Sequence, residues 1–189
     1  MLLFLTGCLL PCIGSAAQEM AALFEALNKP GHFAIMRHAL APGTGDPADF
    51  NLKDRHTQRN LSRRGEDQAR AIGDAFKKHD IDEGRIFTSQ WFRCKETAEL
   101  MDLGPVQELP LLNSFFQDFS KREPQTDALK TWIHEQSLDG LSPPLILVTH
   151  QVNITALTGV FPSSGEIVVL SLDSNNTERR VVGTIKADY

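Results

Sequence analysis

The chain reads Phe33-Ala34-Ile35-Met36-Arg37-His38-Ala39 near its amino terminus and Leu145-Ile146-Leu147-Val148-Thr149-His150 further on. Each stretch contains a short apolar run and reaches a histidine at the end of it. Such runs are typical of buried parallel strands, and open α/β sheets bind ligands at the carboxyl ends of these strands. We therefore expect the two histidines to meet over one site. The arginine directly before His38 suits a phosphoryl group better than a carbonyl group or a metal.

Strands and helices alternate along the rest of the chain. The apolar patterns predict strands over 32–37, 85–88, 106–109 and 145–149, with a closing antiparallel pair over 166–172 and 180–186. They predict helices over 18–28, 62–79, 89–101, 126–136 and 151–158, and a long polar loop over 41–60. This alternation predicts an α/β fold, a three-layer α/β/α sandwich with a mostly parallel central sheet.

The 189 residues are enough for one domain with a hydrophobic core. A net charge of −5 does not indicate nucleic-acid binding, and no interior apolar stretch is long enough to span a bilayer. Residues 2–14 are almost wholly apolar, and Ser15-Ala16-Ala17 after them suits cleavage by signal peptidase. We therefore expect residues 1–17 to be a signal peptide, residues 18–189 to form a single domain, and the protein to be exported, to the periplasm of a bacterium.

Two alternatives stay open for the amino terminus. Leu5-Thr6-Gly7-Cys8 resembles a lipoprotein cleavage box, so that Cys8 could carry a lipid anchor. If the leader is not a signal, it forms a buried first helix and the protein is cytoplasmic. Cleavage after Ala17 would remove Cys8 and Cys12 and leave only Cys94, so the mature chain would form no intrachain disulfide.

Three side chains are candidates for phosphoryl chemistry. His38 is the candidate nucleophile, because an imidazole nitrogen can attack phosphorus if the other ring nitrogen donates to an acceptor. His150 begins the turn after the most apolar strand and would stabilise charge on the transferring group. Arg93 lies four residues after Ser89, on the first turn of the predicted helix, and would clamp phosphate oxygens at the helix amino terminus.

Four separate stretches of the chain carry these residues. They are Arg37-His38-Ala39, Asn60-Leu61-Ser62-x-x-Gly65-x-x-Gln68-Ala69, Thr88-Ser89-x-x-x-Arg93-Cys94-x-x-Thr97-Ala98 and Val148-Thr149-His150. Their order and spacing over residues 32–160 resemble the histidine phosphatase superfamily, the phosphoglycerate mutase-like proteins, and indicate a small exported member of bacterial type. The resemblance implies a phosphohistidine intermediate on His38, with Arg37, Arg93 and His150 lining the phosphate pocket. It implies no metal or other cofactor.

The chain departs from the superfamily in its general acid, which is usually a glutamate just after the third strand. Residues 111–118 contain no glutamate, so Asp118, Glu108 or a loop residue, Asp46 or Asp49, could replace it. If none does, good leaving groups would be favoured over poor alkoxides. A second departure is Ala39, where glycine is more frequent. The segment 54–60, with two arginines and a histidine, could bind the rest of an anionic substrate.

The sequence therefore predicts a metal-independent phosphomonoester hydrolase that acts on a small phosphorylated substrate or a phosphoprotein. A phosphoryl mutase is the nearest alternative, although mutases usually carry larger insertions around the pocket. A non-catalytic phosphate- or phosphoprotein-binding module would account for the missing acid but not for His38. A metal hydrolase would use His38 and His150, but the sequence has no compact ligand motif.

Overall fold

A computed structural model describes residues 13–136, 138, 143–172 and 179–186. Most of the predicted signal peptide lies outside these ranges, as do Cys8, Cys12 and the predicted hairpin turn after residue 172. Among the described residues, no helix is both long enough and apolar enough to cross a membrane.

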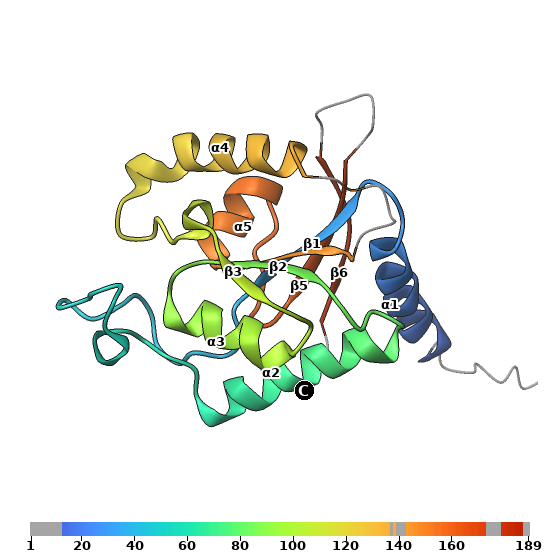
Figure 1. The fold of residues 1–189 in the computed structure, drawn as a ribbon, viewed down its shortest axis with the longest axis horizontal. Coiled ribbons are helices and arrows are strands. Elements are labelled where there is room, and N and C mark those ends of the chain that lie inside the picture. The colour runs from blue at the N-terminus through green and yellow to red at the C-terminus, as the bar shows by residue number, and fades with distance from the viewer. Residues whose placement is uncertain (1–12, 137, 139–142, 173–178, 187–189) are drawn as a thin grey trace, which may run out of the picture.

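Six strands form the central sheet. They are β1 (His32–Arg37), β2 (Arg85–Thr88), β3 (Val106–Glu108), β4 (Leu145–Thr149), β5 (Ile167–Leu172) and β6 (Arg179–Ile185). Their order across the sheet is β3-β2-β4-β1-β5-β6 (Figure 1). Strands β1 to β4 run parallel to one another. Strand β5 runs antiparallel to both of its neighbours, β1 and β6. The prediction of a mostly parallel sheet with a closing antiparallel pair is confirmed.

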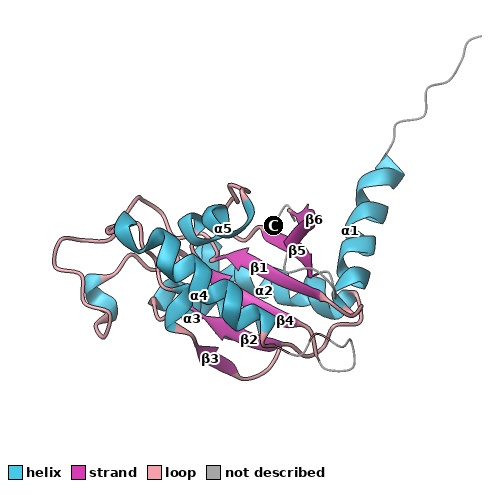
Figure 2. Cartoon of the chain, turned by 90° about the horizontal axis from the view of Figure 1, so that it is seen from above, coloured by secondary structure: helices cyan, strands magenta, loops and turns pink. Residues whose placement is uncertain are grey.

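In the described part of the chain, five α-helices cover the two faces of the sheet. They are α1 (Ile13–Leu27), α2 (Arg63–Lys78), α3 (Phe92–Met101), α4 (Arg122–His134) and α5 (Gln151–Thr158). The first three lie on one face and α4 and α5 on the other (Figures 1 and 2). Because side chains alternate along a strand, Ala34 and Met36 of β1 pack toward α1–α3, whereas Phe33 and Ile35 join the core under α4 and α5. The predicted three-layer sandwich is confirmed.

Three helices begin three or more residues away from their predicted starts. Helix α1 begins at Ile13, before the predicted residue 18, and α4 begins at Arg122, before the predicted residue 126. Pro124 is tolerated in α4 because backbone N–H groups of the first helical turn donate no intrahelical hydrogen bond, so the missing N–H of proline costs none. Helix α3 begins at Phe92, not at Ser89, because the backbone at Trp91 is extended. Ser89 therefore precedes the helix and is not part of its first turn.

Candidate active site

The strand order brings His38 and His150 together. Strands β1 and β4 are neighbours, with Arg37 opposite Thr149, so each histidine follows its strand at the same edge of the sheet. The amide of His38 donates to the carbonyl oxygen of Thr149 at 2.9 Å. The two imidazole rings are buried, with their centroids 5.5 Å apart. The two histidines thus line one cavity at the carboxyl ends of the parallel strands.

His38 has one ring nitrogen available for attack. Its Nδ1 lies 2.7 Å from the carbonyl oxygen of Ala39. Because a carbonyl oxygen only accepts, Nδ1 carries the hydrogen and Nε2 keeps its lone pair in the neutral ring. Burial, together with the charge of Arg93, lowers the pKa of His38 well below 6.5. The imidazole is therefore neutral at pH 7, which is the state that a nucleophile requires.

Residues of two motifs hold the segment that follows this histidine. The amide of Ala39 donates to Thr97 Oγ1 at 3.0 Å, and the amide of Leu40 donates to Gln68 Oε1 at 2.9 Å. A Cβ on Gly65 would lie 2.1 Å from the Leu40 carbonyl oxygen, so any larger residue would push α2 away. The motif residues therefore act by positioning the backbone around the imidazole.

His150 is oriented by a chain of hydrogen bonds. The Ser89 hydroxyl donates to Asn113 Oδ1 at 3.3 Å and accepts from His150 Nε2 at 2.8 Å. This leaves His150 Nδ1 toward the cavity, 3.5 Å from Nη2 of Arg93. Burial and Arg93 lower the pKa of His150 well below 6.5, so the ring is neutral without a ligand. A bound anion would raise this pKa and allow Nδ1 to donate to it.

Three arginines line the same cavity: Arg37, Arg59 and Arg93. Burial and the nearby charge of Arg93 lower the pKa of Arg59 to about 10. In the described structure, the Nε atoms of Arg37 and Arg93 are buried and have no hydrogen-bond partner. Buried donors normally have partners, and N–H groups of guanidinium bind phosphate oxygens well. These unpartnered donors are of the kind that binds an anion with several oxygens.

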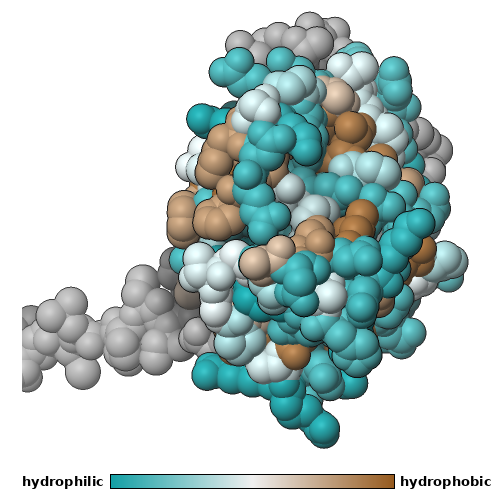
Figure 3. Space-filling model, turned by 90° about the vertical axis from the view of Figure 1, so that its left-hand side faces the viewer, coloured by the Kyte–Doolittle hydropathy of each residue, from teal (hydrophilic) through white to brown (hydrophobic). Residues whose placement is uncertain are grey.

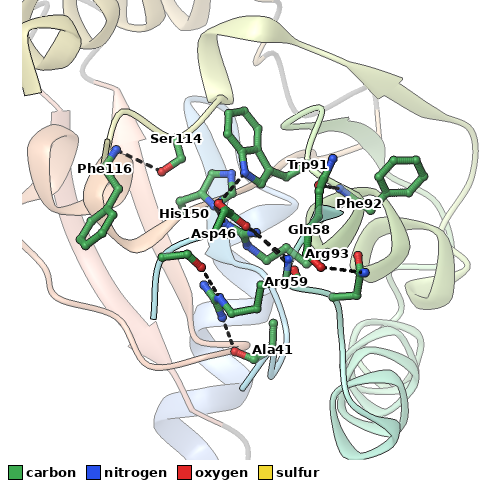
Figure 4. A network of polar contacts seen from close by, with 12 residues as sticks. Ala41, Asp46, Gln58, Arg59, Trp91, Phe92, Arg93, Ser114, Phe116 and His150 are labelled. Carbon is green, nitrogen blue, oxygen red and sulfur yellow. Dashed lines mark hydrogen bonds and ion pairs between the residues drawn. The ribbon is translucent and has the colours of Figure 1, made fainter. Parts of the chain in front are cut away.

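The predicted substrate-binding segment 54–60 is divided by the structure. Arg59 lines the cavity and donates to the carbonyl oxygens of Gly45 and Ala41 (Figure 4). Arg55 instead pairs with Glu96 at 2.7 Å, and His56 is exposed. Neither Arg55 nor His56 is among the residues that line the cavity. The sequence does not distinguish Arg59 from Arg55.

Among the residues that the structure describes, one carboxylate, that of Asp46, lines the cavity. Its Oδ1 lies 2.6 Å from Arg93 Nη1, its Oδ2 lies 3.1 Å from Arg93 Nη2, and Oδ2 also accepts from Trp91 Nε1 at 2.9 Å (Figure 4). Burial by itself would raise the pKa of Asp46, but the hydrogen bonds and charge of Arg93 hold it below its ordinary value. Asp46 is therefore ionised at neutral pH.

The other candidate acids lie elsewhere. Asp118 is exposed and accepts hydrogen bonds from Ser120 and Lys121, which lower its pKa. Glu108 is also exposed, and a 2.7 Å contact with Lys95 lowers its pKa. Neither of them, nor Asp49, is among the residues that line the cavity. The structure thus does not bring these three carboxylates to the histidines.

The cavity is also lined by aromatic, aliphatic and polar side chains that no motif indicated. They include Trp91, Ser114, Phe116, Gln117, Gln151 and Val152. The side chain of Phe116 is 44% exposed. The face of the molecule from which loop 41–60 projects shows hydrophobic residues among hydrophilic ones (Figure 3). The empty space of the cavity is about 610 Å³, a volume that includes open solvent. Within the described part of the chain, no three His, Cys, Asp or Glu side chains could hold a metal ion together.

The chain is an α/β protein with a cavity that two histidines and three arginines line at the carboxyl ends of its parallel strands. The sequence model of the histidine phosphatase superfamily (branch 1) matches residues 33–137, and the chain belongs to that superfamily. It is thus an enzyme of the phosphatase or mutase type. No curated protein sequence matches the chain significantly.

Solved structures of low sequence identity share the fold. The protein histidine phosphatase SixA in complex with tungstate is 18% identical, with a TM-score of 0.58, over 82% of this chain and 96% of that one. A mycobacterial glucosyl-3-phosphoglycerate phosphatase is 15% identical, with a TM-score of 0.56, over 79% of this chain and 96% of the other. At this identity the likeness shows the fold and leaves the substrate open.

The two buried histidines should make the protein sensitive to acid. Their folded-state pKa values are lowered, so the unfolded chain takes up protons below about pH 6.5 that the folded chain does not bind. The free energy of unfolding should then fall by up to about 1.4 kcal/mol per pH unit for each histidine. Urea unfolding between about pH 7 and pH 5.5 measures this slope. A His150→Asn variant should lose about half of it, and an unchanged slope would contradict the expectation.

Proposed function

We propose that the protein is a phosphomonoester hydrolase that works through a phosphohistidine on His38. The observation that carries the proposal is the hydrogen bond from His38 Nδ1 to the Ala39 carbonyl oxygen at 2.7 Å. It leaves the Nε2 lone pair unprotonated in a cavity that three arginines and a second histidine also line. A binding module would need the positive charges but not an unprotonated nitrogen among them.

The reaction would have two steps. In the first, the Nε2 lone pair attacks phosphorus, the bond from phosphorus to the leaving oxygen breaks, and the leaving group takes that electron pair and a proton from water. In the second, a water oxygen attacks phosphorus, the N–P bond breaks, and the electron pair of that bond returns to Nε2. Inorganic phosphate then departs, and the proton of the attacking water passes to solvent. Arg37, Arg93 and His150 would stabilise the charge on the equatorial oxygens in both steps.

Hydrolysis is favoured over phosphoryl isomerisation by the small amount of chain around the cavity. A mutase must shield its phosphoenzyme from water and retain a bisphosphate. Here one long loop, 41–60, and the segment around Phe116 frame the mouth, part of which is open to solvent. The test is a panel of phosphoesters assayed with the purified protein in the presence of a chelator. We expect release of inorganic phosphate, whereas isomerisation without release, or activity only with added metal, would contradict the proposal.

The leaving group should strongly affect the rate. The single carboxylate that lines the cavity, Asp46, is ionised, so the described residues supply no carboxylic acid there. For aryl phosphates, kcat/KM should therefore fall roughly tenfold for each unit by which the pKa of the leaving phenol rises. A series of substituted phenyl phosphates measures this slope. A flat dependence would show that a general acid protonates the leaving oxygen.

This expectation also favours particular natural substrates. Phosphoryl groups on nitrogen or on an acyl oxygen leave without a protein acid more readily than those on an alkoxide. One of the similar structures is that of a protein histidine phosphatase. We therefore place a phosphohistidine-containing protein beside small phosphorylated molecules as a substrate class, and the same panel should include a phosphohistidine peptide.

A further inference from the structure

We propose that Asp46 is a positioning residue for the phosphate clamp. On this view its carboxylate holds the end of the Arg93 guanidinium so that the side edge, made of Nε and Nη2, faces the phosphoryl group. The inference rests on the proposed function in one respect, which is that the ligand of the cavity is a phosphoryl group.

The hydrogen bonds of Arg93 carry the argument. Nη1 donates to Asp46 Oδ1 at 2.6 Å and to the Arg59 carbonyl oxygen at 3.2 Å. Nη2 donates to Asp46 Oδ2 at 3.1 Å and has a long contact of 3.5 Å with His150 Nδ1. A guanidinium has five N–H groups in a fixed plane, so Nε–H remains without a partner, and the outer hydrogen of Nη2 has only the long contact with His150 Nδ1. These two point the same way and form a second fork.

The Nε atom gives independent support for a ligand on this second fork. It is buried and has no partner in the described structure, although Arg93 is only 3% exposed. A buried guanidinium N–H without an acceptor is costly, and a phosphoryl oxygen would satisfy it. Asp46 and a phosphoryl group would thus occupy different edges of one guanidinium, and both can be bound at the same time.

Asp46 is itself held in place from several sides. Trp91 Nε1 donates to Oδ2 at 2.9 Å, and the amide of Arg59 donates to Oδ1 at 3.4 Å. The chain turns toward the cavity through Gly43 and Gly45, whose φ angles of 95° and 69° favour glycine. The side chain of Asp46 is only 6% exposed. Such a fixed carboxylate can transmit its own position to the guanidinium that it binds.

Two other roles for Asp46 make different predictions. If Asp46 blocked the site, its carboxylate would occupy the Nε edge of Arg93, whereas its contacts are with Nη1 and Nη2. If Asp46 were the general acid, it would have to be protonated, whereas Arg93 keeps its pKa low. Removal of the carboxylate would tighten anion binding in the first case and would harm poor leaving groups most in the second.

The experiment compares Asp46→Asn and Asp46→Ala with Asp49→Asn, an exposed aspartate of the same loop. Tungstate binding, measured by calorimetry, reports the clamp without any turnover. We expect Asp46→Ala to weaken tungstate binding by about tenfold or more, because bidentate charged hydrogen bonds orient the guanidinium. Asp46→Asn, which keeps one oxygen acceptor, should show a smaller loss, and Asp49→Asn should bind like the unmodified protein.

Two further measurements separate positioning from a general loss of structure. The factor by which kcat/KM decreases in the Asp46 variants should be the same for aryl phosphates with good and with poor leaving groups. In an Arg93→Ala background, Asp46→Ala should cause no further loss of tungstate affinity, because the two residues act as one unit. The Asp46→Asn variant preserves the side-chain shape and serves if the alanine variant does not fold.

Tighter tungstate binding, unchanged binding, or a loss that grows with the pKa of the leaving group would each overturn the assignment. Failure of the proposed function looks different: the unmodified protein would bind tungstate but hydrolyse no phosphoester. The binding measurements on the Asp46 variants would still decide whether this carboxylate positions Arg93.

Discussion

Replacing His38 with alanine should abolish turnover and the phosphoenzyme together. Its Nε2 is the nitrogen left free by the bond from Nδ1 to Ala39, and the second imidazole of the cavity is held through Nε2 by Ser89. Loss of a covalent nucleophile typically lowers kcat by a factor on the order of 10⁴–10⁶. Rapid-quench labelling with a ³²P substrate should give a protein-bound label that is stable to alkali and labile to acid, as phosphohistidine is, and the variant should show none.

Two variants serve as controls for this experiment. His150→Ala should slow the reaction but keep some label, since His150 only stabilises charge. His56→Ala, which alters an exposed histidine outside the cavity lining, should react like the unmodified protein. Steady turnover by the His38→Ala protein would end the covalent mechanism. A label on His150 in place of His38 would reverse the two roles.

Replacing Arg93 with alanine should give the second largest effect, a loss in kcat/KM of about 10²–10³. The variant would lose the fork that faces the phosphoryl group, and it would leave the buried carboxylate of Asp46 without its cation. Arg93→Lys should lose less activity than Arg93→Ala, because an ammonium keeps the positive charge. It should still lose some, because an ammonium cannot form two parallel hydrogen bonds. Steady-state kinetics on one aryl phosphate compare the two variants.

The matched control is Arg55→Ala. Arg55 is exposed and pairs with Glu96 at 2.7 Å, outside the cavity lining. An exposed ion pair contributes little to stability, so this variant should keep nearly full activity. If Arg93→Ala also keeps near-full turnover, the assignment of the phosphate pocket is wrong.

The strands that carry the two histidines could be predicted from the sequence because they are buried on both faces. Strands β1 and β4 have the predicted bounds, and the residues of β4 are all buried. A run of apolar residues is sufficient for such a prediction, since neither face of the strand meets water. The convergence of the histidines also follows from parallel strands, whose carboxyl ends share one edge of the sheet.

Helix ends and loop contacts could not be predicted in the same way. Ser89 was expected in the first turn of a helix, yet the backbone at Trp91 is extended and the Ser89 hydroxyl binds His150. Local sequence favours serine near a helix start, but it carries no information about an imidazole 61 residues away. The tertiary contact therefore decides the role of this side chain.

The layers of the fold, the two strand-end histidines and the arginines beside them could be predicted from local patterns, because burial and strand direction leave a signal in neighbouring residues. Which loop residues enter the cavity depends on contacts with residues far away in the chain. Asp46 and Arg59 lie there, whereas Asp49 and Arg55 do not. Loop 41–60 has no hydrophobic periodicity, and its conformation depends on hydrogen bonds that Trp91 and Arg93, 45 and 47 residues away, donate to the carboxylate of Asp46.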